Sequence, residues 1–290
     1  MSPVASVIVA GSLHYDILVD APDRPRKGET VTGRSWAPKC GGKGGNQAVA
    51  AARHGAPTAM VGAIGDDEFG PPLRARLAAA GVDHSAVKTL AGVGSGMSVA
   101  IFDDDGDYGA VIVSGANLSV ASAAVSDDVL AQAKVLVLQN EIPEAVNAAL
   151  AQRAQRHGVT VILNAAPARP FMTDLPRSVD VIVVNATEAE DLGCGAVTSL
   201  DAALTAAHKL AATYRSVIVT AGGDGVAAVH DAQSLLLPAI PVDLISTHGA
   251  GDAFVGTFAA VLARGGSFSE GLDAANREAA RIVSTPERAR

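Results

Sequence analysis

The chain has 290 residues, of which 49% are apolar and only 18% are charged. This length and composition provide for a large buried core and exclude a disordered chain. The formal net charge is −8 and the sequence contains no run of Lys and Arg, which argues against nucleic acid and anionic lipid as partners.

Cysteine usage and hydropathy indicate the compartment. Cys40 and Cys194 lie far apart without metal-ligand spacing, so neither a disulfide framework nor a zinc site is predicted. The N-terminus enters a strand pattern directly, and no apolar stretch approaches the roughly 18 residues of a membrane span. We therefore expect a cytoplasmic protein that does not contact a membrane.

Short β-branched segments alternate with alanine-rich helical segments along the chain. Strands are predicted at residues 7–10, 58–62, 135–139, 159–164, 181–185 and 217–220. Helices are predicted at residues 46–54, 72–80, 142–157, 187–192, 200–213, 252–264 and 269–284. Continuously apolar strands separated by helices are typical of a parallel sheet covered on both faces. The sequence thus predicts one α/β domain over residues 1–290, with a doubly wound, mostly parallel sheet.

Two segments interrupt this alternation. Residues 14–40 contain several prolines around short extended pieces. Residues 94–113 contain two alternating strands, 96–102 and 108–113, joined by a turn-rich run at 103–107. Because no helix is available to cover them, these segments predict a small projecting β-sheet. Such a sheet can act as a lid over a ligand bound at its base.

The strongest chemical signal is the run Gly249-Ala250-Gly251-Asp252, which leads into an apolar helix. Small residues at a helix start leave backbone N–H groups bare, and these groups bind an anion such as a transferring phosphate. Asp252 has two interpretations at this position. It is either the N-terminal cap of the helix or a base that takes the proton from an attacking hydroxyl.

A second glycine-rich run, Gly41-Gly42-Lys43-Gly44-Gly45, precedes Asn46 and the predicted helix. Glycines permit close approach of the main chain to a ligand, while Lys43 and Asn46 add a charge and an amide. The run is not a Walker A loop, because no Ser or Thr follows the lysine. Taken alone, a flexible turn is the other interpretation.

Two carboxylates follow predicted strands. Asp16 lies just past the first strand, where α/β proteins bind ligands, and it either holds two vicinal hydroxyls of a ligand or caps a turn. Glu141 follows strand 135–139 and is either a ligand-binding group or the solvated start of the next helix.

Two further features follow later strands. Glu188 lies in the first turn of a predicted helix, where it either stabilises the helix start or holds Mg²⁺ through water. The run at 220–225 is a glycine turn that either passes the phosphates of a nucleotide or forms a hairpin.

Together and in this order, these runs resemble the ribokinase family, the PfkB-type carbohydrate and nucleoside kinases. The resemblance extends from Gly11 to about Asn276 and rests on GGKGGNQ at 41–47 and GAGD at 249–252. The runs TVTG at 30–33, GAN at 115–117 and NAAPA at 164–168 are similar to the ribokinase branch.

The resemblance implies a role for each matching residue. Asp252 would be the base, with the backbone of Gly249, Ala250 and Gly251 as the anion hole. The sugar would be bound by His14, Asp16, Gly42, Lys43, Asn46, Glu141 and Asp252. ATP would be bound by Asn185, Thr220, Gly222, Gly223, Gly225, Gly251 and Asn276, and Mg²⁺ would be oriented by Glu188 through water. The lid would pair with a second lid across a homodimer.

The chain departs from the family pattern in three places. His14 stands where ribokinases usually have Asn, and a larger, titratable ring is suited to a different sugar. Ser246 stands where the family usually has an Asp that helps to bind an activating monovalent cation. The sequence ends with residues 282–290, short of the glycine-containing tail that completes that cation loop in ribokinases. We therefore do not expect K⁺ to activate this protein.

The sequence thus predicts transfer of the ATP γ-phosphate to a primary hydroxyl of a small sugar, such as ribose or a related pentose or ketose. One alternative is a nucleoside kinase on the same fold, which the sparse aromatics of the predicted lid disfavour. The other alternative is a catalytically weakened sugar-binding or regulatory protein, which Ser246 and the short C-terminus would fit.

Overall fold

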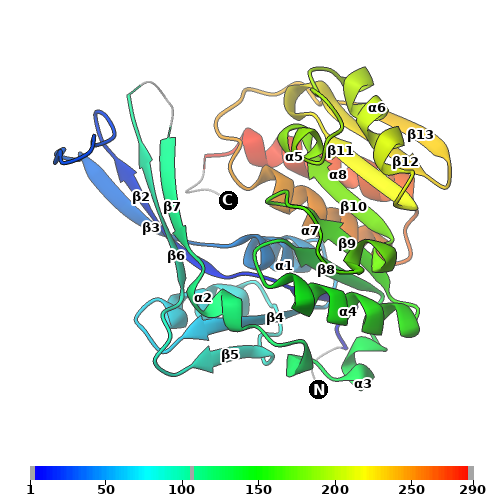
Figure 1. Ribbon diagram of the computed structural model, residues 1–290, viewed down its shortest axis with the longest axis horizontal. Helices are drawn as coiled ribbons and strands as arrows, with labels where there is room; N and C mark the ends of the chain where they lie inside the picture. The colour runs from blue at the N-terminus through cyan, green and yellow to red at the C-terminus, as the bar shows by residue number, and fades with distance from the viewer. Residues whose placement is uncertain (1–3, 105–107, 287–290) are drawn as a thin grey trace.

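A computed structural model describes residues 4–104 and 108–286 (Figure 1). The turn predicted at 103–107 lies partly outside these described residues. So does the tail from 287 to 290, which belongs to the segment compared above with the cation loop of ribokinases. Within them, no helix combines the length and the apolar character needed to cross a membrane.

The core of the molecule is a nine-stranded sheet. Seven strands are mutually parallel, and two antiparallel strands extend one edge. The spatial order is β13 (Gln233–Pro238), β12 (Gly225–His230), β11 (Ser216–Thr220), β10 (Val181–Asn185), β9 (Thr160–Asn164), β8 (Val135–Gln139), β1 (Val7–Ala10), β4 (Thr58–Gly65) and β5 (Val87–Leu90).

Helices cover both faces of this sheet, because successive strand residues point to opposite sides. Ile8 contributes to the core on one face, whereas Val7 and Val9 contribute to the core on the other. The first face packs against α3 (Asp127–Leu130), α4 (Glu144–Arg156), α5 (Ala186–Asp191) and α6 (Leu200–Leu210). The second face packs against α1 (Lys43–Arg53), α2 (Gly70–Ala79), α7 (Ala250–Ala263) and α8 (Phe268–Val283). The predicted doubly wound fold is confirmed.

Four other strands form a separate sheet that projects from the main body (Figure 1). Their order is β3 (Ser35–Gly41), β2 (His14–Asp20), β6 (Gly96–Phe102) and β7 (Tyr108–Val113). β2 pairs antiparallel with β3 and parallel with β6, so both predicted lid segments contribute to one sheet. Trp36, Val111 and Ile112 are exposed on it.

The structure corrects several predicted boundaries. The first helix begins at Lys43 rather than at 46, so Gly44 and Gly45 are helical and not part of a flexible turn. Strands β5, β12 and β13 were not predicted, and the run at 220–225 proves to be the hairpin turn between β11 and β12. Short 3-10 turns, also not predicted, are η1 (Gly115–Ser119), η2 (Ser122–Ala124), η3 (Leu175–Ser178) and η4 (Gly222–Asp224).

Candidate active site

Asp252 lies in the first turn of α7 but does not cap the helix. The cap is Gly249, whose φ of 79° falls in the left-handed region that glycine adopts without strain. Asp252 is the third helical residue, and its side chain turns away from the helix start toward α1. The capping interpretation is therefore wrong, and the carboxylate is available for chemistry.

Two neighbouring amides of α1 hold the Asp252 carboxylate. Asn46 Nδ2 donates to Oδ2 across 2.8 Å, and Gln47 Nε2 donates to Oδ1 across 3.0 Å. Burial raises the pKa of Asp252, while the nearby charge of Lys43 and these two hydrogen bonds pull that pKa down. The amides thus favour the ionised form that a base requires.

A chain of buried amides fixes the direction of Gln47. Its Oε1 accepts a hydrogen bond from Gln139 Nε2 across 2.7 Å, and its Nε2 also donates to Asn164 Oδ1 across 3.0 Å. Asn164 Nδ2 in turn donates to the Val183 carbonyl across 3.2 Å. Gln47 can therefore present only N–H groups to Asp252. This chain of amides was not predicted, although its signal is in the sequence: Gln139 and Asn164 end predicted strands, and Gln47 follows shortly after GGKGG.

The start of α1 is pressed against the end of β1. A Cβ on Gly44 would lie 2.7 Å from the Gly11 carbonyl carbon and from the Ser12 backbone nitrogen, so a larger residue does not fit. Gly42 adopts φ 85° just before the helix. The glycines thus serve a close backbone contact that places Lys43 and Asn46 at the site.

Glu141 lies among donors rather than in solvent at a helix start. Its Oε2 accepts hydrogen bonds from Ser12 Oγ and from the Lys43 backbone N–H, the latter across 3.0 Å. The helix that follows begins only at Glu144. The interpretation of Glu141 as a solvated first turn is therefore wrong.

His14 and Asp16 line the same face of β2. Ser98 Oγ donates to Asp16 Oδ1 across 2.5 Å. His14 is only 4% exposed, and its Nδ1 lies 3.9 Å from Glu141 Oε2. Within the described residues its buried Nε2 has no hydrogen-bond partner. The structure therefore brings His14, Asp16 and Glu141 together at the base of the small sheet.

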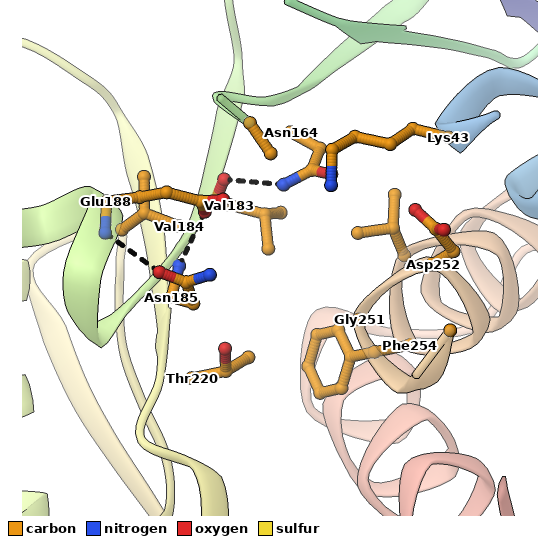
Figure 2. Close-up of a pocket in the computed structure, with 13 residues that line it drawn as sticks. Lys43, Asn164, Val183, Val184, Asn185, Glu188, Thr220, Gly251, Asp252 and Phe254 are labelled. Atoms are coloured by element: carbon orange, nitrogen blue, oxygen red, sulfur yellow. Dashed lines mark hydrogen bonds between the residues drawn. The ribbon is translucent and has the colours of Figure 1, made fainter. Parts of the chain in front are cut away.

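A pocket of about 180 Å³ opens in front of Asp252 (Figure 2). One side of it is lined by Lys43, Gly251 and Asp252. The opposite side is lined by Asn185 at the end of β10, Glu188 of α5 and Thr220 at the end of β11. Several residues predicted for the anion hole and the nucleotide are thus brought together.

Other predicted nucleotide residues lie outside the lining of this pocket: Gly222, Gly223, Gly225 and Asn276. Asn276 Nδ2 donates to the Pro238 carbonyl across 3.0 Å. Gly225 has φ 121° where the backbone passes close to β13. The Ala250 N–H donates to the Thr247 carbonyl across 3.3 Å, so one predicted anion-hole donor is already engaged.

Glu188 has the structural role that its position predicts. Its Oε2 accepts from the Asn185 N–H across 2.9 Å, and its own N–H donates to Asn185 Oδ1 across 2.8 Å, which is a complete capping box. Burial raises the pKa of Glu188, while the Asn185 hydrogen bond and the charge of Lys43 oppose that rise. Throughout the described part of the chain, no three His, Cys, Asp or Glu side chains are grouped as a metal site.

A doubly wound sheet with a small second sheet, and a carboxylate at a glycine-led helix start, define a ribokinase-like α/β protein. The pattern of the pfkB family carbohydrate kinases matches residues 4–289, and the chain belongs to this family.

Individual relatives agree with this assignment. Ribokinase of Bacillus subtilis is 34% identical over 280 residues, which span 96% of this chain and 92% of that protein. Deoxyribokinase of Salmonella typhi is 33% identical over 258 residues, spanning 87% and 84%. The structure of Arabidopsis thaliana ribokinase complexed with ribose and ATP superposes with a TM-score of 0.89 at 30% identity, covering 97% of this chain and 93% of the other.

Proposed function

We propose that this protein is an ATP-dependent sugar kinase that phosphorylates a primary hydroxyl of ribose or a closely related pentose or ketose. The observation that carries the proposal is the Asp252 carboxylate, which two amides hold at a glycine-led helix start beside Lys43. Relatives named ribokinase and deoxyribokinase support a pentose as the acceptor.

In this proposal the sugar lies between the small sheet and α1. Asp16 and Glu141 accept hydrogen bonds from its hydroxyls, with His14, Gly42, Lys43 and Asn46 completing the site. Asp252 takes the proton of the attacking hydroxyl as that oxygen bonds to the γ-phosphorus. The bond from the γ-phosphorus to the bridging oxygen then breaks, and ADP leaves with the electron pair.

Backbone donors at the start of α7 stabilise the charge on the transferring phosphoryl group. Gly249 and Gly251 present N–H groups, and that of Ala250 joins them once it leaves the Thr247 carbonyl. ATP is contacted by Asn185, Thr220 and Asn276. It is also contacted by the turn that contains Gly222, Gly223 and Gly225. Magnesium held through water by Glu188 would neutralise phosphate charge.

The four-stranded sheet is proposed to act as the lid of a single kinase domain and to pair with a second copy. Trp36 and Val111 are each 68% exposed, and an exposed apolar sheet of this kind is suited to burial against a partner. A homodimer through the lid would cover these side chains. We also propose a cytoplasmic location and no activation by K⁺, because Ser246 carries no charge.

A panel assay tests the proposal. ATP consumption is measured with ribose, deoxyribose, fructose, polyols and adenosine, for the wild type and for Asp252→Asn. We expect turnover on a pentose and a loss of about 100-fold or more in kcat for Asp252→Asn with sugar and ATP binding retained. Turnover on adenosine instead would establish a nucleoside kinase. Sugar binding without phosphorylation would establish a regulatory protein.

A further inference from the structure

The fold gathers cationic side chains that are scattered in the sequence. A second cavity, of about 350 Å³, lies between β3, α1, α2, the start of α7 and α8. Its lining includes Lys39 of β3, Arg53 of α1 and Arg76 of α2, although the whole chain carries a net charge of −8. Such a concentration of positive charge in a concave site attracts anions.

Arg76 makes this cavity unusual. Its guanidinium is half-buried, yet it forms no hydrogen bond or ion pair with any other described residue. Arg74 on the same helix shows the contrast, because it donates to the carbonyls of His84 and Val87 and to Thr89 Oγ1. A desolvated guanidinium without partners is costly, and burial lowers the pKa of Arg76 accordingly.

The acidic groups nearby do not neutralise the cavity. Glu278 is the only carboxylate in its described lining, and Arg281 already pairs with it across 2.6 Å. Asp16 and Asp252 act on Arg76 only through space, without a hydrogen bond, and the neighbouring Arg53 opposes them. His248 also lines the cavity. Arg53 and Arg76 therefore outnumber the one carboxylate of the described lining.

We propose that this cavity binds a small phosphate-bearing anion, with Arg76 as its bidentate anchor and Arg53 and Lys39 as supporting charges. A planar guanidinium matches the oxygens of a phosphate group, and a volume of about 350 Å³ is suited to a phosphorylated pentose. The cavity and the pocket in front of Asp252 share Gly249, and the cavity also includes Asn46, so it adjoins the candidate active site.

Calorimetric titration of the full chain with inorganic phosphate and, separately, with ribose 5-phosphate tests this site. Wild type is compared with Arg76→Gln and Arg53→Gln, and with Arg156→Gln as a control on α4, across the sheet. We expect saturable binding that is about tenfold or more weaker in each cavity variant and unchanged in the control. A larger loss of ribose 5-phosphate binding than of phosphate binding in the cavity variants would identify a sugar phosphate as the ligand of the cavity. An equal or larger loss of phosphate binding would identify the free ion.

Binding that survives both cavity variants would belong to the anion hole at α7 and would overturn the proposal, as would the absence of saturable binding. Arg53 is exposed, so Arg53→Gln keeps the test valid if Arg76→Gln fails to fold. The titration needs no turnover, so its outcome is independent of the sugar-kinase activity, which is assayed in parallel on the same preparations.

Discussion

Gln47 Nε2 donates a hydrogen bond to Asp252 Oδ1 across 3.0 Å, between residues that lie 205 positions apart in the chain. Both hydrogens of this amide are engaged, one by Asp252 and one by Asn164, and Gln139 holds its oxygen. A side chain fixed in this way favours the carboxylate over the carboxylic acid, because an N–H group can only donate.

Replacing Gln47 by Leu is expected to move the acid limb of the kcat profile to higher pH. The base works as a carboxylate, so activity is lost as pH falls through the pKa of Asp252. Removing a hydrogen bond that lowers this pKa raises it further. The pH dependence of kcat and KM for the sugar checks this, with the exposed Gln155→Leu as the control. An acid limb at the wild-type position would contradict a positioning role.

Replacing Gly44 by Ala is expected to destabilise the fold by about 1–3 kcal/mol and to lower activity, because the added methyl overlaps the backbone of Gly11 and Ser12. Gly94→Ala is a matched control, since its new Cβ would meet only Asp67 Oδ2 at 3.7 Å. Urea unfolding measures both changes. Equal midpoints for the two variants would show that α1 can shift away from β1 at little cost.

Much of the fold was predictable because continuous β-branched segments, such as 135–139 and 181–185, indicate buried parallel strands. β13 was not predictable, because no residue of this edge strand is fully buried and only Leu235 and Leu237 pack against the core. The start of α1 was also missed, because glycine opposes helix formation locally and only the contact with Gly11 requires it there.

The candidate site was predictable to a similar degree. Asp16, Glu141 and Asp252 follow strands or begin a helix, and these positions are readable from the sequence. The partners of Asp252 were not readable, because Gln47 and Gln139 meet only after the sheet has formed. Local patterns identify the reactive groups, whereas tertiary contacts decide what orients them.

Replacing Ser246 by Asp is expected to introduce K⁺ activation into a protein that we propose lacks it. Ser246 Oγ accepts a 3.3 Å hydrogen bond from the His248 N–H, and a neutral hydroxyl is a weak ligand for a cation. Turnover of both proteins is measured in K⁺ and in a bulky organic cation. Strong K⁺ activation of the wild type would contradict the expectation.

Replacing Glu188 by Gln separates the capping role from the metal role. Gln keeps an oxygen for the Asn185 N–H, so the capping box is expected to survive. Burial raises the pKa of Glu188 above its usual 4.5, so the folded protein favours the protonated carboxyl. The stability of the wild type therefore falls as pH rises above about 4.5 and through the raised pKa of Glu188. The variant should therefore be at least as stable as the wild type at neutral pH, and this advantage should vanish below about pH 4.5.

The same variant should require more Mg²⁺ for half-maximal activity, because a neutral amide attracts the ion less strongly. Thermal unfolding across pH and a Mg²⁺ titration measure the two effects separately. An unchanged Mg²⁺ requirement would leave Glu188 with the capping role alone.

Replacing His14 by Asn is expected to change which sugar is preferred. The His14 ring is buried beside Glu141 at 3.9 Å, and its Nε2 has no hydrogen-bond partner within the described residues. A buried polar atom without a partner is costly, so we expect a substrate hydroxyl to bond to it. Asn is shorter, so it leaves more room and directs its hydrogen bond elsewhere.

The ratio of kcat/KM between the preferred sugar and ribose should fall by about tenfold or more in His14→Asn, while KM for ATP stays unchanged. If ribose is itself the preferred sugar, the quantity compared is the ratio of kcat/KM for ribose to kcat/KM for deoxyribose. His157→Asn, at the exposed end of α4, is the control. Unchanged ratios across the panel would mean that Nε2 faces no substrate hydroxyl, and sugar choice would then depend on Asp16 and Glu141.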